Sequence, residues 1–303
     1  MVKMQRLAVL PIAALVLAAC QNGGSGGSAG ESAETADITN VVCVGEATTY
    51  LDWLEGSLSI SEADPIEEPA QTGNPDDLLA IIQERGEILV STDPNYAPQS
   101  FLESDGTFVG FDIDVATEIA ERLGVEVVFE TPDWDAITAG SWSERWDISV
   151  GSMTITDDRK EVLSFTEPYY FTPAQLAAST DSGVSSLEDL PFELPDGAEA
   201  TTLPTDANCA EAIRAGREEF SLWISSSTTV DAAIEEGVPI VAVGDPVFAE
   251  PLSVAIDKSG PPHDELLYEI NNIITEMHDD GTLTALSDEW YGLDLTEGTA
   301  SSE

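Results

Sequence analysis

The sequence predicts an α/β fold, in which short buried strands alternate with amphipathic helices. Three apolar runs, at residues 88–90, 125–129 and 146–150, have the length and composition of buried strands. Apolar residues at helical spacing cover residues 78–86, before the first run, and 113–123, between the first and the second. Because strands joined through helices pair in parallel, these segments favour a sheet flanked by helices.

Boundary signals support each element. The first helix follows Pro75-Asp76-Asp77 and ends at Gly86, so proline and acids stand at its start and glycine at its end. A turn at Asp105-Gly106 precedes the second helix. Ligands of such sheets bind beyond the carboxyl ends of the strands. We therefore expect residues 93–96 and 152–159 to line one cleft.

The charge of the chain excludes several kinds of partner. The 303 residues include 10 Lys+Arg and 58 Asp+Glu, for a net charge of −48, while 42% are hydrophobic, which is enough for a core. This excess of acids repels nucleic-acid phosphates and anionic membrane surfaces, so we expect neither as a partner. We interpret the acids as a solvated coat that keeps the protein soluble.

The first residues are typical of an export signal. A basic start with Lys3 and Arg6 precedes an apolar stretch of 13 residues, 7–19, which is too short to span a bilayer. It ends in Leu17-Ala18-Ala19-Cys20, which resembles the lipobox of bacterial lipoproteins. We therefore predict cleavage before Cys20 and an extracytoplasmic protein that lipid at Cys20 holds on the cell membrane. The alternative is an ordinary secretory signal with a chance cysteine.

Two cysteines remain in the exported chain, Cys43 and Cys209. In an oxidising compartment an even pair favours a disulfide, and the alternative is two free buried thiols. Together with His263 and His278 they do not have the spacing of a metal site, so we expect no metal and no cofactor.

Four stretches of the sequence carry a family resemblance. They are GFDID at 110–114, TITDDR at 154–159, FTEPY at 165–169 and EMHDDGTLTALSDEWYG at 276–292. With them, residues 76–295 resemble the extracellular solute-binding proteins of family 3, the polar amino-acid receptors of ABC importers. The resemblance implies a two-lobed clamshell of the periplasmic-binding-protein-like type II class. Each lobe would be a mostly parallel sheet flanked by helices, and the monomer would close around its ligand and dock on a permease.

The resemblance also implies a ligand site. Arg159 matches the family's arginine, which takes the ligand α-carboxylate in a bidentate pair, and it is one of few basic residues in the chain. Its alternative is a surface pair with a neighbouring acid. Ser152 and Thr154 match positions that hydrogen-bond the ligand, and Tyr96 and Trp134 match the aromatic walls of the first lobe.

The roles of three acids follow from the same resemblance. Asp93 matches a position at the pocket edge, where a solvated loop acid is the alternative. Asp112 and Asp114 belong to the GFDID motif, and we expect them to act structurally at a helix start, where acids suit the helix dipole.

The sequence departs from the family pattern at the start of the second lobe. A strand, a small-residue turn and a Thr-Thr pair are expected soon after residue 190 but are missing there. A matching unit stands at residues 41–54, and it contains Thr48 and Thr49. We predict that this relocated strand and helix fill the empty place, so that Thr48 and Thr49 reach the ligand carboxylate from a helix N-terminus. A Cys43–Cys209 disulfide could pin the segment. The alternative is an unrelated extension with a truncated second lobe.

A second departure concerns the ligand's amino group. Where amino-acid receptors of the family place an aspartate, this chain has Ser226. A hydroxyl does not neutralise a buried ammonium, so another acid would have to serve, with Asp245, Asp93 and Glu46 as candidates, or the ligand is not a simple α-amino acid. Ser226 could equally cap the helix that follows it.

These observations divide the chain as follows. We predict a signal peptide at 1–19, a lipidated tether at 20–38, a strand-helix unit of lobe two at 39–60, an acidic linker at 61–75, lobe one at 76–178 and 247–296, lobe two at 179–246, and a disordered tail at 297–303. Crossover strands near 175–179 and 247–256 would form the hinge.

The predicted function is capture of a polar amino acid or related small carboxylate for an ABC importer, without catalysis. Two alternatives use the same fold. One is an enzyme of the cyclohexadienyl dehydratase type, which would need an acid/base pair in the cleft. The other is a sensory ligand-binding protein, which usually has a transmembrane link to a signalling module.

Overall fold

The computed structural model describes residues 41–44, 61–70, 72–186, 200–203, 206–217, 221–246 and 249–297. All of these belong to one compact unit, Thr35–Glu303. The predicted signal peptide, Cys20, the tether, the helix expected after residue 47 and the tail after 297 lie outside the described residues. No helix in the described part is long and apolar enough to cross a membrane.

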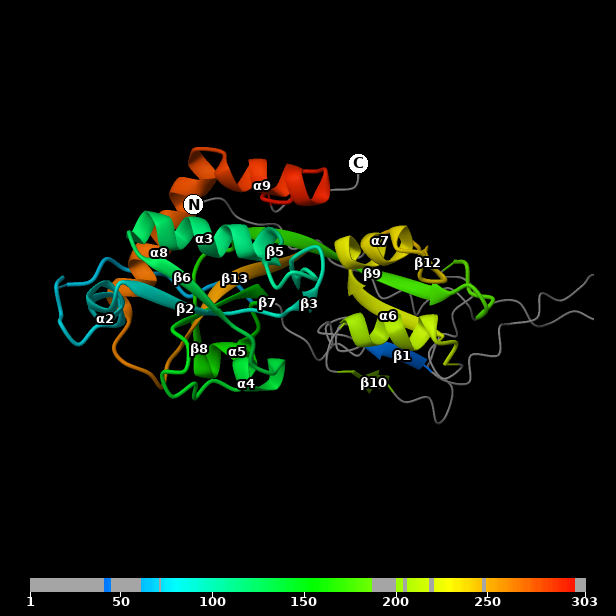
Figure 1. Ribbon diagram of the computed structural model, residues 1–303, viewed down its shortest axis with the longest axis horizontal. Helices are drawn as coiled ribbons and strands as arrows, with labels where there is room; N and C mark the ends of the chain where they lie inside the picture. Colours follow the sequence, from blue (N-terminus) through cyan, green and yellow to red (C-terminus); the bar gives the residue numbers. More distant parts are fainter. Residues whose placement is uncertain are drawn as a thin grey trace, which may run out of the picture. The chain divides into compact units, whose positions relative to one another are not determined.

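One group of strands surrounds β2 (Glu87–Ser91) (Figure 1). This strand pairs in parallel with β6 (Glu126–Glu130) and with β7 (Ile148–Thr154). The other neighbours are antiparallel: β13 (Ala249–Asp257) pairs with β7 and also with β8 (Leu163–Phe165). The three strands predicted in this part of the chain are all present, within one to four residues of their expected ends.

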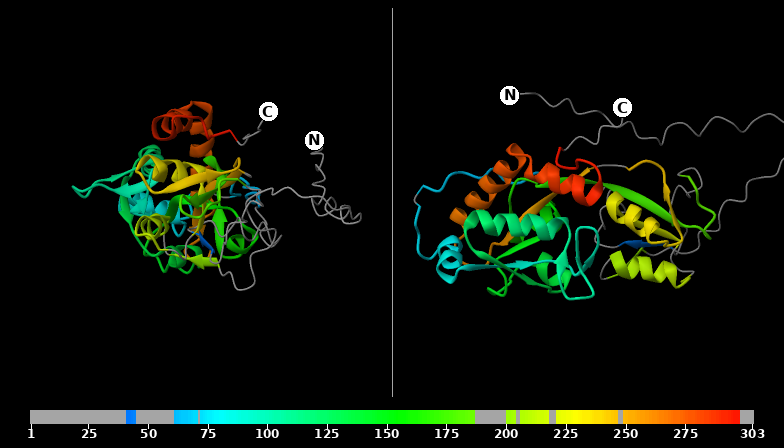
Figure 2. Two further views of the ribbon diagram at one scale, coloured as in Figure 1. Left: turned by 90° about the vertical axis from the view of Figure 1, so that its right-hand side faces the viewer. Right: turned by 45° about the horizontal axis from the view of Figure 1, so that its top comes forward.

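Helices cover this sheet and bury its apolar side chains. They are α2 (Leu78–Arg85), α3 (Phe111–Leu123), α4 (Trp134–Thr138), α5 (Asp157–Val162), α8 (Asp264–Asp279) and α9 (Thr282–Tyr291). Side chains of α2, α3, α8 and α9 share one core with β2, β7 and β13. Figure 2 shows α8 and α9 beside α3. The first helix has the predicted ends, because the Asp77 carboxylate accepts a hydrogen bond from the Leu79 amide and Gly86 takes a left-handed conformation.

A small antiparallel sheet precedes α3. It consists of β3 (Asn95–Tyr96), β4 (Ser100–Leu102) and β5 (Phe108–Val109). Gly110 joins it to α3 with φ +132°, and a Cβ at this position would lie 2.3 Å from the carbonyl oxygen of Gln99. Only glycine fits this approach, so the first residue of the GFDID motif fixes how α3 leaves the small sheet.

The second group of strands contains β1 (Val41–Val44), β10 (Ala200–Thr202), β11 (Leu222–Ser226) and β12 (Ile240–Val243). Helices α6 (Asp206–Arg214) and α7 (Ser227–Glu235) accompany them. A separate core forms here around Trp223, with Ile213 from α6 and Val230 from α7. The two cores correspond to two lobes.

The N-terminal strand β1 lies in the second group, although it precedes the whole first group in the sequence. It pairs in parallel on both sides, with β10 and with β11, so that Val44 stands opposite both Thr202 and Ile224. Helix α6 lies next to β1 (Figure 1). It carries Cys209, which is part of a disulfide. The side chain of Cys43 is outside the described part.

Two long strands join the groups. Strand β9 (Tyr170–Ser179) pairs with β13 through residues 170–173 and with β11 through residues 174–178, while β12 pairs with β9 at residues 176–179. All pairs of β9 and β13 to other strands are antiparallel. Each lobe is therefore a mixed sheet, with parallel pairs at β2 and β1 and antiparallel pairs along the two crossing strands.

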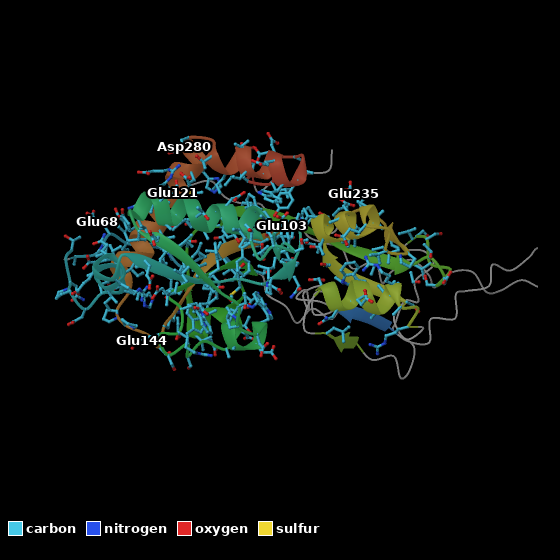
Figure 3. All side chains as sticks on the ribbon, in the orientation of Figure 1. Glu68, Glu103, Glu121, Glu144, Glu235 and Asp280 are labelled. Carbon is cyan, nitrogen blue, oxygen red and sulfur yellow. The ribbon has the colours of Figure 1, made fainter. Side chains whose placement is uncertain are left out.

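Acidic side chains cover the outside of the molecule. Figure 3 shows six labelled acids on both lobes, all exposed: Glu68, Glu103, Glu121, Glu144, Glu235 and Asp280. Few cations balance them. Arg122 serves several acids at once, and its guanidinium lies 2.7 Å from the Glu118 carboxylate and 2.9 Å from that of Asp280. This arrangement agrees with a solvated coat, in which water, not ion pairing, compensates most of the charge.

The position of β1 predicts a large effect of proline there. Val44→Pro removes a backbone donor and introduces a ring into a strand that is paired on both sides, where proline is not accommodated. Thermal melting of the mature chain should show a clearly lower midpoint for this variant. Glu67→Pro, in the exposed extended stretch before α2, is the control and should melt as the parent does. Equal midpoints for both variants would exclude β1 from the sheet.

Candidate functional site

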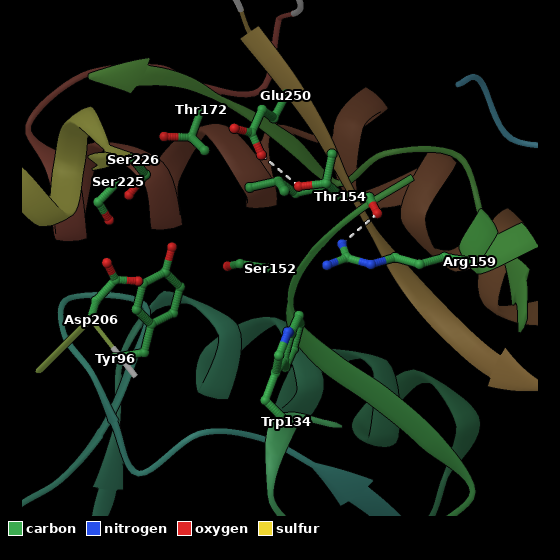
Figure 4. A pocket seen from close by; sticks show the side chains of 11 residues that line it. Tyr96, Trp134, Ser152, Thr154, Arg159, Thr172, Asp206, Ser225, Ser226 and Glu250 are labelled. Atoms are coloured by element: carbon green, nitrogen blue, oxygen red, sulfur yellow. Dashed lines mark hydrogen bonds between the residues drawn. The ribbon is translucent and has the colours of Figure 1, made fainter. Parts of the chain in front are cut away.

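A pocket lies where β7, β9, β11 and β13 come together with β3, α4, α5 and α6 (Figure 4). Its lining is polar, with two aromatic side chains and three charged ones. The lining residues are Tyr96, Trp134, Ser152, Thr154, Arg159, Thr172, Asp206, Ser225, Ser226, Glu250 and Leu252. Six residues that the sequence predicted for the ligand site are among them: Tyr96, Trp134, Ser152, Thr154, Arg159 and Ser226.

The cation of the pocket is Arg159, in the first turn of α5. The hydroxyl of Thr156 caps this helix by accepting from the Arg159 amide. The guanidinium donates through Nη1 to the carbonyl oxygen of Thr154 at 2.9 Å and lies 5.4 Å from the centre of the Trp134 ring. A cation over an aromatic face is held by the ring quadrupole. Arg159 therefore has a defined orientation at the end of β7.

Glu250 bonds to the same residue as this cation, Thr154, and was not predicted. It is 6% exposed, and its Oε2 accepts from the Thr154 hydroxyl at 2.5 Å. Thr154 thus contacts the arginine through its carbonyl and the glutamate through its hydroxyl. The sequence does contain a signal for Glu250, because an acid at the start of the apolar stretch 252–256 is unusual for a buried strand.

A second unpredicted acid, Asp206, begins α6. It is 2% exposed, and its Oδ1 accepts from the Trp223 indole N–H at 3.0 Å. Acids favour helix N-termini, so sequence reasoning assigns such a residue to the helix and not to a ligand. Asp206 can be recognised as a pocket residue only from the fold, which brings the start of α6 close to Trp223 of β11.

Ser152 connects the pocket to a buried carboxylate. Its backbone has φ +54°, and its hydroxyl donates to Oδ2 of Asp112 at 2.7 Å. The Tyr169 hydroxyl donates to Oδ1 of the same carboxylate at 2.8 Å. Burial raises the pKa of Asp112 to about 7, although both hydrogen bonds oppose this rise. Asp112 lies in the first turn of α3, and its carboxylate bonds to Ser152, a residue of the pocket lining.

Ser226 has both of the roles that the sequence left open. It lines the pocket and caps α7, because its hydroxyl accepts from the Thr229 amide. The side-chain amide of Gln99 donates to Ser226 at 3.3 Å and to the Thr228 hydroxyl at 2.9 Å. These bonds link the loop before β4 in lobe one with the start of α7 in lobe two.

The remaining predicted site residues have other surroundings. Asp93 and Asp245 are not among the residues that line this pocket. The Asp93 carboxylate accepts from the Asn95 amide at 2.7 Å, and burial raises its pKa. Asp245 is exposed. Thr48, Thr49 and Glu46 lie outside the described residues.

Within the described ranges, no group of three or more His, Cys, Asp or Glu side chains is arranged to hold a metal ion. The lining of the pocket is polar and charged. It offers one guanidinium, two carboxylates, several hydroxyls and two aromatic faces within a largely buried space.

Comparison with known proteins identifies the class. Residues 88–293 match the model of the bacterial extracellular solute-binding proteins, family 3, and the chain belongs to this family. Its two lobes have the periplasmic-binding-protein-like type II fold.

Individual relatives agree with this class. The L-cystine-binding protein TcyJ of Escherichia coli K12 is 28% identical over 238 residues, which cover 73% of this chain and 88% of the relative. Among solved structures, the ancestral amino acid-binding protein AncCDT-1, a precursor of cyclohexadienyl dehydratase, is 29% identical with a TM-score of 0.61, covering 70% of this chain and 99% of that one. A variant of ArgBP from T. maritima is 26% identical with a TM-score of 0.62, covering 71% and 99%.

The buried Asp112 predicts a pH dependence of stability. Its pKa is about 7 in the folded chain and close to 3.8 when unfolded, so folding favours the protonated carboxyl. The stability that this proton contributes is complete below about pH 4 and is lost as pH rises through about 7, at about 1.4 kcal/mol per pKa unit. Asp112→Asn stays neutral and should flatten the decrease in unfolding free energy between about pH 4 and pH 8.

Urea unfolding at a series of pH values measures this difference. Asp105→Asn, in an exposed turn where hydrogen bonds from Thr107 lower the pKa of the acid, is the control and should keep the parent's slope above pH 5. An identical slope in parent and Asp112→Asn would show that Asp112 is ionised in the folded protein.

Proposed function

We propose that this protein captures an α-amino acid in the pocket between its two lobes and delivers it to an ABC permease. Family membership supports the import role, and several relatives are named for the amino acids that they bind. The observation that carries the proposal is the arrangement around Thr154, whose carbonyl accepts from an arginine and whose hydroxyl donates to a glutamate.

Arg159 is the proposed partner of the ligand α-carboxylate. A guanidinium carries five N–H donors, so it can hold a backbone carbonyl and a carboxylate together. Its position over Trp134 limits the motion of the side chain before the ligand arrives. Ser152 and Thr154 provide hydroxyl groups nearby, and Thr48 and Thr49 are proposed as further contacts to the same carboxylate.

Glu250 is the proposed partner of the ligand ammonium. The ammonium and carboxylate of an α-amino acid leave the same carbon atom, so their protein partners must also be close together. Glu250 meets this condition because it bonds to the residue that also receives Arg159. It replaces Asp245, Asp93 and Glu46 as the candidate for the charge that Ser226 does not supply.

Closure would occur about β9 and β13. We assign residues 76–178 with 247–296 to lobe one and residues 179–246 with 39–60 to lobe two, so that both connections pass through these strands. The pocket draws its residues from both lobes, and ligand contacts to both would favour the closed form, which the permease recognises. We propose that the protein acts as a monomer.

One observation supports the alternative that the protein is an enzyme: two carboxyl groups line the pocket. Glu250 or Asp206 could serve as a general acid, and AncCDT-1 is described as a precursor of a dehydratase. Incubation with prephenate or arogenate distinguishes the two functions, because a binding protein forms no product.

We further propose that lipid at Cys20 anchors the mature chain outside the cytoplasmic membrane. The apolar stretch 7–19 and the small residues before Cys20 support this location. Strand β1 would then follow a tether of about twenty residues, which is long enough to let the lobes turn freely above the membrane.

Isothermal titration with amino acids tests the two charged contacts. Arg159→Lys should weaken binding of an α-amino acid and of its 2-oxo analogue, each by about 10- to 100-fold, because both ligands carry the carboxylate. Glu250→Gln should weaken only the amino acid, since the 2-oxo analogue has no ammonium. Glu103→Gln, an exposed acid of lobe one, is the control. If Glu250→Gln weakens both ligands equally, Glu250 does not bind the ammonium.

Mass analysis of the protein extracted from membranes tests the proposals for the three cysteines. We expect a diacylglyceryl group on Cys20 and, without reductant, a peptide that links Cys43 to Cys209. Cys20→Ser should release the protein from the membrane. A free thiol at Cys43, or a chain without lipid, would contradict the corresponding proposal.

A further inference from the structure

We infer that the ligand carries a second cationic group at the end of its side chain, and that Asp206 is the residue that selects it. The inference rests on the proposed function, because it takes Arg159 and Glu250 as the partners of the α-carboxylate and α-ammonium. The class comprises amino acids whose side chain ends in an ammonium or guanidinium, and cystine, whose second α-ammonium has the same chemistry.

The Asp206 side chain is buried, and a hydrogen bond fixes its carboxylate. It is 2% exposed, and the Trp223 indole donates to its Oδ1 at 3.0 Å. The start of α6 adds the positive end of a helix dipole, which favours the ionised carboxylate. The carboxylate is therefore already fixed in the lining of the pocket. Ligand binding would cost this side chain little conformational entropy.

Asp206 lies away from the contacts proposed for the amino-acid backbone. Figure 4 shows Asp206 beside Tyr96 on one side of the pocket and Arg159 on the other, with Ser152 between them. A ligand that binds Arg159 and Glu250 through its α-carbon would direct its side chain towards Asp206. Tyr96 offers an aromatic face there, which suits a cation or its alkyl chain.

A neighbouring hydroxyl supports a polar group at this end. Ser225 is 1% exposed, and its Oγ has no hydrogen-bond partner within the part of the chain that the structure describes. The same holds for Oγ1 of Thr172, on β9 opposite Glu250. Buried hydroxyls normally bond to a partner, so these two are suited to accept from a ligand that brings several N–H donors.

The charges of the pocket also favour a ligand with a cationic group at the end of its side chain. The described lining contains one cationic side chain, Arg159, and two acidic ones, Asp206 and Glu250. The zwitterionic end of an amino acid balances Arg159 and Glu250 but adds no net charge. A distal cation on the ligand would add an attraction to the Asp206 carboxylate that a neutral side chain does not provide.

Pairs of ligands with nearly equal shape provide the test. Arginine and citrulline differ mainly in the charge of the distal group, and lysine and norleucine differ in the distal ammonium; cystine is measured separately. Titration of the mature protein should give at least about ten-fold tighter binding of the charged member of a pair. Asp206→Asn, whose amide oxygen can still accept from Trp223, should remove this preference and leave citrulline within about three-fold of the parent.

The controls separate this inference from the proposed function. Asp231→Asn, an exposed acid on α7 of the same lobe, should keep the preference. If the parent binds the charged and the neutral ligand of a pair with equal affinity, the inference is wrong but the proposed function stands. The same holds if Asp206→Asn weakens the binding of both ligands by the same factor. The comparison on the parent needs no variant, so it stands even if Asp206→Asn does not fold. If no amino acid binds at all, the proposed function fails and the inference with it.

Discussion

The antiparallel pairing of β9 with β13 is the constraint on which the arrangement of the molecule depends. Strand β9 bonds to β13 over its first residues and to β11 and β12 over the rest, so one strand belongs to both sheets. The pocket lies at this crossing, and Thr172, Glu250 and Leu252 come from the two strands themselves. Binding groups and the connection between lobes are therefore parts of the same backbone.

The pocket also resolves an electrostatic difficulty of so acidic a chain. A single guanidinium surrounded by dozens of carboxylates could pair at the surface instead of meeting a ligand. The Thr154 carbonyl and the Trp134 ring hold Arg159 at the end of β7, where it lines the pocket. Exposed acids remain hydrated and screened, whereas the few buried ones act at short range. Local structure, and not net charge, decides what the site binds.

Sequence reasoning predicted much of the fold and about half of the site. Periodicity and end signals located α2, α3 and the strands around β2, and the family resemblance placed Arg159, Thr154 and Ser152 in one pocket. Asp206 and Glu250 were missed because each has an ordinary local explanation, as a helix-start acid and a strand-end acid. Their role depends on which strands meet, and that is a property of the tertiary structure. Asp93 was selected by motif position, yet its loop directs it to a neighbouring amide.

The place of β1 has a consequence for how the chain matures. The strand nearest the N-terminus completes its hydrogen bonds only with β10 and β11, whose residues lie after 199. Until the residues after 199 have been made, β1 therefore has neither of its strand partners. Contacts so distant in sequence slow folding, because a long loop must close before they form. An acidic, Pro-containing stretch at 61–70 separates this strand from lobe one and disfavours its premature association.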